Sequence, residues 1–214
     1  MILAIFLSVF SLLLAALPAA MGASSYDYRL GNPALWHSEI TYCPTNSYLT
    51  RKYVGYTSGF VPVAAIVDTP SSTYGYIGVQ SSISAIVVTF RGSQDFNNWI
   101  TNLDAVTTTY PYCSGCAVHK GFSDAEKKVF PDILTQVKSL QAKYPSYTVL
   151  ATGHSLGAAL ATLTAFDLIH NGIKNVKLFN YGSPRVGNTA FADWASTNKI
   201  ITRQTHYKVN FPSP

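Results

Sequence analysis

The sequence predicts an α/β domain in which helices cover a mostly parallel central sheet. Strand-like and helical stretches alternate along the second half of the chain, which is the order that builds parallel strands with crossover helices. Of the 214 residues, 48% are hydrophobic and 12% are charged, a composition that excludes an intrinsically disordered chain. No internal repeat, linker or low-complexity tract divides the chain, so one domain is the simplest organisation.

The first segment is expected to be removed before the domain functions. Residues 2–17 are apolar apart from Ser8 and Ser11, and small residues follow up to Ala23. This pattern is typical of a secretory signal peptide at residues 1–22, although no Lys or Arg precedes the apolar run. The alternative is an uncleaved membrane anchor, for which the run is short. We therefore expect a secreted, extracellular protein whose domain spans residues 23–214.

The elements of the domain follow from local patterns. Two β-rich stretches, residues 74–80 and 85–90, flank a polar serine turn and predict a hairpin. A capping-box pattern at Ser123–Glu126 predicts the start of a helix with apolar residues at helical spacing up to Leu140, and Pro131 is expected to kink it or to delay its start. The elements expected after it are a strand at 147–152, a helix at 155–170, a strand at 176–181, a helix at 191–196 and a strand at 200–207.

The charge pattern disfavours a nucleic-acid partner. Fifteen Lys and Arg against ten Asp and Glu give a net charge of +5. The densest basic runs, Arg51–Lys52 and Lys127–Lys128, are only two residues long and form no basic stripe.

The three cysteines support export, but one of them is left without a partner when the other two pair. Cys113 and Cys116 are separated by two residues, a spacing found in metal half-sites, redox pairs and tight disulfides. A zinc site needs two more ligands and no second cysteine pair exists, so a disulfide is favoured. Cys43 is then odd, which implies a missing partner or a free thiol.

The motif that carries chemistry is G-x-S-x-G at Gly153–Gly157, placed between the predicted strand and helix. The two glycines permit a sharp turn that lifts the Ser155 hydroxyl clear of the sheet. The helix start leaves N–H groups free, so Leu156 N–H can stabilise a developing oxyanion. The alternative interpretation is a glycine-rich turn in which Ser155 only caps the helix.

Several sequence blocks taken together resemble the fungal class 3 lipases, α/β-hydrolases that include secreted triacylglycerol lipases and feruloyl esterases. The resemblance runs from about Tyr42 to His206. It rests on five blocks: residues 86–93, 98–100, 118–122, 152–158 and 180–188.

The resemblance implies roles for residues that spacing alone does not assign. Ser155 would be the acyl-enzyme nucleophile and Ser93 the second oxyanion donor beside Leu156. Residues 94–103, with Trp99 among their apolar side chains, match the lid of family lipases and would suit an oil–water interface. No metal or cofactor is needed for this chemistry, and no stable membrane insertion is expected after signal cleavage.

The resemblance ends before the family's acid and base. A serine hydrolase needs a base to take the serine proton and an acid to orient that base. The family's acid would fall at Val209, and its catalytic His and a Cys that would pair with Cys43 lie further on. We therefore expect that the chain is C-terminally truncated, as a gene-model error or a real isoform, and that it is inactive as printed.

None of the histidines present is expected to replace the missing base. His154 precedes the nucleophile and should point away from the Ser155 face, and His119 and His206 match structural positions of the family. His37 and His170 lie outside the matching blocks, and Asp167 is expected on a solvated face.

Two classes of function remain open. One is a secreted carboxylic-ester hydrolase, in the first place a triacylglycerol lipase acting through a Ser155 acyl-enzyme on lipid or ester substrates at an oil–water interface. A feruloyl or other soluble-ester esterase is the alternative within this class. The other is a catalytically inactive truncated isoform. We favour the hydrolase.

Overall fold

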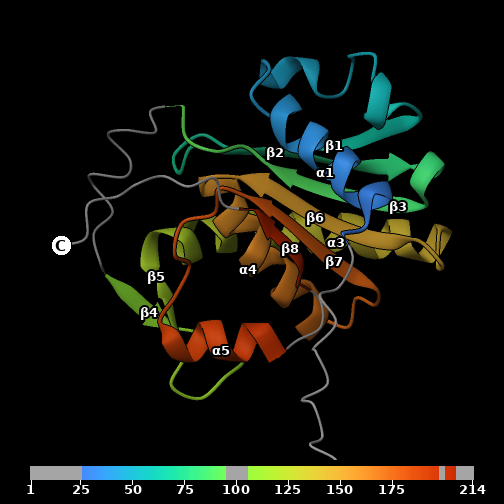
Figure 1. Cartoon of the computed structure of the whole chain (residues 1–214). Helices are drawn as coiled ribbons and strands as arrows, with labels where there is room; N and C mark the ends of the chain where they lie inside the picture. The colour runs from blue at the N-terminus through green and yellow to red at the C-terminus, as the bar shows by residue number, and fades with distance from the viewer. Residues whose placement is uncertain (1–25, 95–105, 198–200, 206–214) are drawn as a thin grey trace, which may run out of the picture.

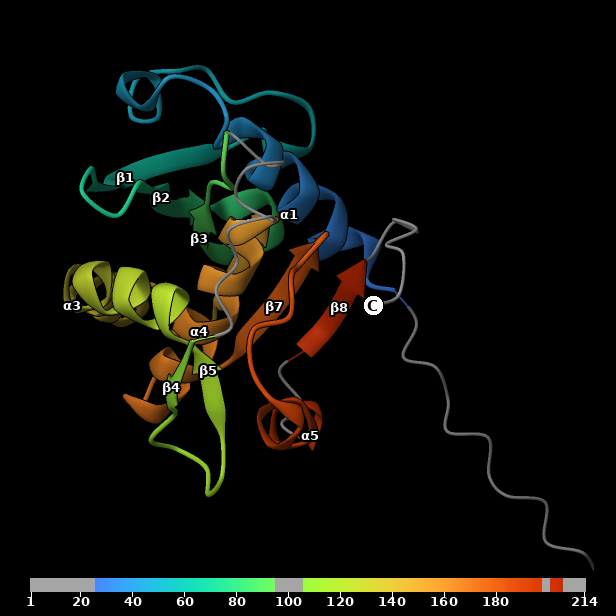
Figure 2. The same ribbon diagram turned by 90° about the vertical axis from the view of Figure 1, so that its left-hand side faces the viewer.

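The computed structural model of the chain describes residues 26–94, 106–197 and 201–205, the last five by their backbone alone. The expected signal peptide, residues 95–103 of the expected lid, and residues 206–214 lie outside the described residues. In the described part, six strands form one sheet in the order β1-β2-β3-β6-β7-β8, and β4 and β5 form a separate hairpin (Figures 1 and 2).

The sheet is antiparallel at one edge and parallel through the rest. β1, β2 and β3 run as an antiparallel meander, whereas β3, β6, β7 and β8 are mutually parallel neighbours. The prediction of a mostly parallel sheet flanked by helices is therefore confirmed. The strands are β1 Phe60–Asp68, β2 Thr73–Gln80, β3 Ala85–Phe90, β4 Thr107–Thr109, β5 Ala117–His119, β6 Thr148–His154, β7 Val176–Tyr181 and β8 Ile201–Thr205. The α-helices are α1 Tyr28–Ile40, α3 Lys120–Lys143, α4 Leu156–His170 and α5 Thr189–Thr197.

Helices cover both faces of the sheet, and this explains its apolar middle strands. α1 lies on one face, and α3 and α4 lie on the other (Figure 2). Every residue of β3 is buried: Ile86 and Val88 belong to the core beneath α3 and α4, and Val87 belongs to the core beneath α1. A strand covered on both faces reads as a continuous apolar run rather than an alternating one.

Most expected elements are confirmed with shifted ends. β2 and β3 form the predicted antiparallel pair, joined through a 3₁₀ turn at Ser81–Ile83. The later strands and helices each lie within a few residues of the predicted ranges. The sequence patterns do not predict α1, β1 or the β4–β5 hairpin. α1 buries polar His37 and Ser38 together with its apolar residues, so its buried face carries no clear apolar period.

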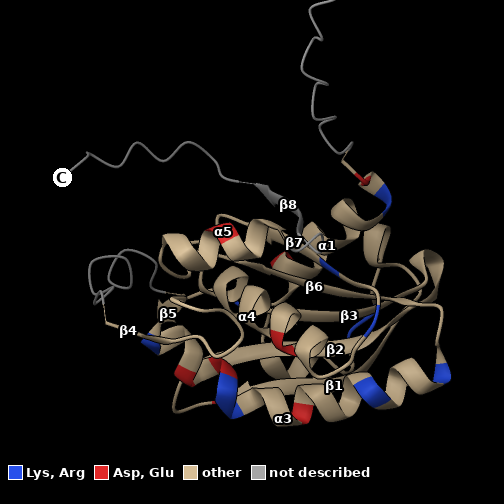
Figure 3. Cartoon of the chain, turned by 90° about the horizontal axis from the view of Figure 1, so that it is seen from below, with Lys and Arg blue, Asp and Glu red and all other residues tan. Residues whose placement is uncertain are grey.

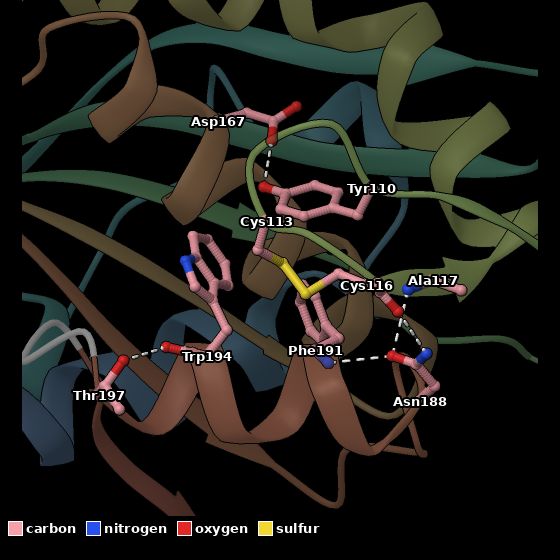
Figure 4. The surroundings of a disulfide bond; sticks show 10 residues. Tyr110, Cys113, Cys116, Ala117, Asp167, Asn188, Phe191, Trp194 and Thr197 are labelled. Carbon is pink, nitrogen blue, oxygen red and sulfur yellow. Dashed lines mark hydrogen bonds between the residues drawn. A yellow bond between two sulfur atoms is a disulfide. The ribbon is translucent and has the colours of Figure 1, made fainter.

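The capping-box prediction for α3 is wrong. The helix begins at Lys120, three residues before Ser123, and continues through Pro131. Glu126 is therefore a helix-interior residue, only 1% exposed, and its Oε1 accepts a hydrogen bond from the Thr164 hydroxyl of α4 at 3.4 Å. The solvated position expected for Asp167 is also wrong, because this partly buried carboxylate accepts a 2.6 Å hydrogen bond from the Tyr110 hydroxyl (Figure 4).

The buried Glu126 predicts a pH-dependent stability. Burial raises the pKa of its carboxyl to about 8, with a further rise from the Asp167 charge. Between about pH 4.5 and 8 the folded chain thus holds a proton that the unfolded chain has released. We expect the free energy of unfolding to fall as pH rises through this window, by up to about 5 kcal/mol, and then to level off.

Urea unfolding of the Glu126→Gln variant across this pH range checks the expectation. The variant should lose most of the slope and exceed the parent in stability at the alkaline end. Asp124→Asn is the matched control, because Asp124 is an exposed carboxylate of the same helix that forms an ion pair with Lys120. A parent-like slope in Glu126→Gln would show that the buried carboxyl does not titrate as argued.

The disulfide prediction is confirmed, because Cys113 and Cys116 are bridged at the tip of the β4–β5 hairpin. Cys43 has no disulfide partner. Figure 4 shows the bridge beside the α5 side chains Phe191 and Trp194. The Asn188 side-chain oxygen accepts bonds from the backbone N–H groups of Ala117 and Phe191, at 3.1 and 2.9 Å. The hairpin and α5 are thereby held together.

Candidate active site

Ser155 occupies the sharp turn between β6 and α4. β6 ends at His154, α4 begins at Leu156, and Ser155 between them adopts φ +54° and ψ −124°. A positive φ is strained for a residue with a side chain, and such strain concentrates at functional turns. The Ser155 N–H donates to the Tyr181 carbonyl at 3.0 Å, which fixes the turn to β7. The elbow predicted from the sequence motif is therefore present.

Two glycines make the turn possible, as the sequence pattern indicates. A Cβ on Gly153 would lie 2.3 Å from the backbone carbonyl carbon and oxygen of Gly157. A Cβ on Gly157 would lie 2.3 Å from the carbonyl oxygen of Phe90, at the end of β3. The start of α4 therefore rests directly on the backbone of two neighbouring strands.

The segment after β3 packs against this turn at Gly92. Phe90 and Gly153 are partners in the parallel register of β3 and β6, so the two strands end side by side. A Cβ on the next glycine, Gly92, would lie 2.7 Å from the His154 carbonyl oxygen and 3.1 Å from Ser155 Cβ. The backbone at Gly92 therefore lies against the elbow. We call residues 92 and 93 the oxyanion loop, after the role that the family resemblance predicts for Ser93. Ser93 follows Gly92 in the chain, and Leu156 follows Ser155 as the first residue of α4.

No described histidine is hydrogen-bonded to Ser155. The side chain is 1% exposed, and its Oγ has no hydrogen-bond partner among the described residues. His37 is fully buried elsewhere, where it bonds Tyr76 and Gln80, and burial lowers its pKa to about 4. His170 stacks on Tyr112, with ring centroids 3.8 Å apart.

The other two described histidines, His119 and His154, also form no hydrogen bond to Ser155 Oγ. His119 is the residue before α3, and its side chain makes no capping hydrogen bond. Its ring lies 4.3 Å from the Phe122 ring, centroid to centroid, and neither ring nitrogen has a hydrogen-bond partner among the described residues. His154 turns its ring to Tyr42, whose hydroxyl lies 2.6 Å from Nδ1. The sequence patterns give no indication of Tyr42, because this contact joins residues 112 positions apart.

A groove of about 820 Å³ opens between the loop after β7 and α5, and it is lined by Thr162 of α4, residues 183–189 and apolar side chains of α5. Ser155 does not line it. Within the described ranges, no helix has the length and apolarity needed to cross a bilayer, and no three His, Cys, Asp or Glu side chains gather as metal ligands. Figure 3 shows basic and acidic residues interspersed along α3.

Comparison with known proteins identifies the family. The model of the family described as "Lipase (class 3)" matches residues 87–208, which include the oxyanion loop and the elbow. The chain belongs to the class 3 lipase family. The family predicted from the sequence blocks is confirmed.

Curated and solved members of the class 3 lipase family resemble this chain over most of its length. It is 42% identical over 147 residues to secreted mono- and diacylglycerol lipase A of Penicillium cyclopium, which covers 69% of the chain and 48% of the relative. It is 38% identical over 184 residues to a lipase of Rhizomucor miehei, covering 78% and 51%. A triacylglycerol lipase whose catalytic centre is described as a serine protease triad superposes with a TM-score of 0.75 at 32% identity, covering 83% of this chain and 70% of that one.

The chain spans about half the length of the curated relatives it matches. The roles of Ser155, Ser93 and Leu156 accordingly remain predictions, which the geometry of the elbow supports.

Proposed function

We propose that this class 3 lipase family member is a secreted ester hydrolase that acts on acylglycerols through a Ser155 acyl-enzyme. The observation that carries the proposal is the strained Ser155 turn with the oxyanion loop packed on it. The names of the relatives, which include secreted mono- and diacylglycerol lipases, support the substrate class and the export.

In the proposed reaction, Ser155 Oγ forms a bond to the ester carbonyl carbon, and the carbonyl oxygen becomes an oxyanion. The N–H groups of Leu156 and Ser93 stabilise that charge. The C–O bond then breaks, the alcohol leaves with a proton, and water hydrolyses the acyl-enzyme to a free acid. No metal takes part in this sequence of steps.

The proton of Ser155 needs a base that the described residues do not supply. His37 and His154 form hydrogen bonds with other side chains, and His170 stacks on Tyr112. His119 has no hydrogen-bond partner among the described residues, and Ser155 Oγ is bonded to none of the four. We propose that the base and its orienting acid lie outside the described residues. A serine without its base keeps only the residual catalysis of the oxyanion donors, roughly 10³ to 10⁴ over water.

The segment at residues 94–103 is proposed as a lid that meets an oil–water interface. Its side chains include Phe96, Trp99 and Ile100, which suit lipid better than a soluble ester. A feruloyl or other soluble-ester esterase is the alternative. The family that the sequence resembles includes both triacylglycerol lipases and feruloyl esterases.

Covalent labelling tests the nucleophile, and a substrate panel tests the class. A fluorophosphonate probe should label the protein at Ser155, as located by peptide mass spectrometry, and more slowly than it labels the Penicillium cyclopium lipase. In a catalytically competent form of the protein, emulsified diacylglycerol and triacylglycerol should be hydrolysed in preference to ethyl ferulate. Labelling at another serine would overturn the mechanism, and faster turnover of ethyl ferulate would favour the esterase.

A further inference from the structure

Strand β1 forms one edge of the six-stranded sheet, and among the described residues only β2 pairs with it. A β-bulge interrupts the pairing between Pro62 and Ala64, and the stretch from Ala64 to Asp68 then continues without a break. In an edge strand, backbone N–H and C=O groups point outward and have no partner in the sheet. The stretch 64–68 therefore presents backbone groups with which another strand can pair.

The exposed side chains of β1 are apolar. Val61, Val63 and Val67 are 62%, 42% and 54% exposed. Ala65, which lies among them, is exposed as well. The strand holds no Lys, Arg or Glu, and its one acidic residue, Asp68, is the last of the strand. Natural edge strands are often protected by charged side chains, above all Lys, and β1 lacks this protection up to its final residue.

A second copy of β1 fits this edge, because the stretch is complementary to itself. Ala65 lies opposite Tyr76 in the β1–β2 register, and Tyr76 belongs to the core beneath α1. Ala65 and Val67 therefore face the same side of the sheet as α1. When the stretch 64–68 pairs antiparallel with itself about a two-fold axis at Ile66, Ala65 of each copy lies opposite Val67 of the other. The pairing covers the exposed valine with an apolar neighbour.

Helix α3 carries opposite charges beside the same edge. It runs alongside β1 on the other face of the sheet (Figure 3), and a groove of about 460 Å³ between them is lined by residues 64–68 and by Lys128 and Asp132. These two exposed side chains lie one helical turn apart. Lys128 lies 3.9 Å from an Asp68 carboxylate oxygen, and Asp132 has no ion pair among the described residues. A two-fold axis that passes between Lys128 and Asp132 places each of them opposite the other in the second copy.

Strand and helix together supply the area that a specific contact needs. The stretch 64–68 is about 17 Å long. Its pairing alone therefore buries less than the roughly 1,200 Å² in total of a specific interface. The valines before the bulge and the groove side of α3 add to this area. β2 and β3 lie between β1 and the strand that carries the Ser155 elbow, so the contact leaves the elbows of both copies uncovered.

We propose that two copies of this chain associate through an antiparallel β1–β1 contact, flanked by ion pairs between Lys128 of each copy and Asp132 of the other. The contact joins the two sheets edge to edge. Because it is isologous, it closes at the dimer and does not continue into a filament. The inference goes beyond the proposed ester hydrolysis and does not depend on it.

Sedimentation velocity of the full 214-residue chain tests the edge contact. Between about 1 and 200 μM it should show a monomer–dimer equilibrium with a dissociation constant on the order of 10 μM. Val67→Lys brings a charge into the contact and should raise that constant at least about 10-fold. Val54→Lys is the matched control, because Val54 is 55% exposed and lies outside the strands, and it should change the constant by less than about 2-fold.

Thermal unfolding of each variant checks that the fold is retained. A parent that stays monomeric over the whole range would overturn the proposal and leave the edge to a segment of another protein. Dimers of Val67→Lys as strong as those of the parent would place the contact elsewhere and overturn it as well.

Charge reversal tests the two-fold arrangement of the helices. Asp132→Lys sets two basic side chains opposite each other, and Lys128→Glu sets two acidic ones opposite each other. Each variant alone should therefore dimerise at least about 10-fold more weakly than the parent. Mixed in equal amounts, the two variants should form a heterodimer within about 3-fold of the parent's constant, because every facing pair then has opposite charges. A mixture that associates no better than either variant alone would overturn the proposed contact.

Discussion

Replacing Ser155 by alanine is expected to abolish fluorophosphonate labelling and to lower ester hydrolysis by a catalytically competent form of the protein at least about 1000-fold. The Oγ atom would carry the acyl group, and no other described hydroxyl occupies the elbow. The fold should survive, because alanine keeps the Cβ and meets the positive φ of this turn at about the same cost as serine. Removing a buried Oγ that lacks a partner among the described residues should even add up to about 1 kcal/mol of stability.

Hydrolysis of p-nitrophenyl butyrate and thermal unfolding, measured on the same preparations, check both halves of this expectation. Ser183→Ala is the control, since Ser183 is a buried serine beyond the end of β7 whose hydroxyl bonds the carbonyl of Pro184. It should keep both activity and labelling. Activity in Ser155→Ala above about one part in a thousand of the parent would mean that another group is the nucleophile.

Replacing Gly157 by alanine is expected to destabilise the chain by at least about 3 kcal/mol and to disturb the site. The added methyl would lie 2.3 Å from the Phe90 carbonyl oxygen and 2.9 Å from the Arg91 carbonyl carbon. Both atoms belong to backbone, so α4 must move away from β3 or the oxyanion loop must shift. Either movement separates Leu156 from Ser93, and Ser155 labelling should fall along with stability.

Gly121→Ala is the matched substitution in another helix. Its methyl would meet only the His119 ring, at 3.1 Å, and an alanine is the better helix former. We expect its unfolding free energy to stay within about 1 kcal/mol of the parent. Urea unfolding of the two variants side by side measures the difference. Equal stabilities would show that the close approach of α4 to β3 relaxes freely.

The sequence by itself determined those features that depend only on residues close together along the chain. The strand run, the two glycines and the serine of the elbow lie within ten residues of one another, and backbone sterics alone dictate that turn. The Cys113–Cys116 bridge follows in the same way, because a two-residue spacing already places the two thiols close together. The strands β3, β6 and β7 can also be predicted from the sequence, because burial on both faces makes each apolar run continuous.

Tertiary packing alone decided which polar groups are buried and what they contact. Ser123 and Glu126 fit a helix start by pattern, yet α3 begins earlier because the chain enters it directly from β5, and Glu126 is then turned toward α4. Tyr42 reaches His154 and Gly92 only because α1 lies across β6, and no local preference encodes a contact across 112 residues. A local sequence pattern reflects which backbone conformations its residues favour. A buried hydrogen bond depends instead on two distant segments being folded against each other.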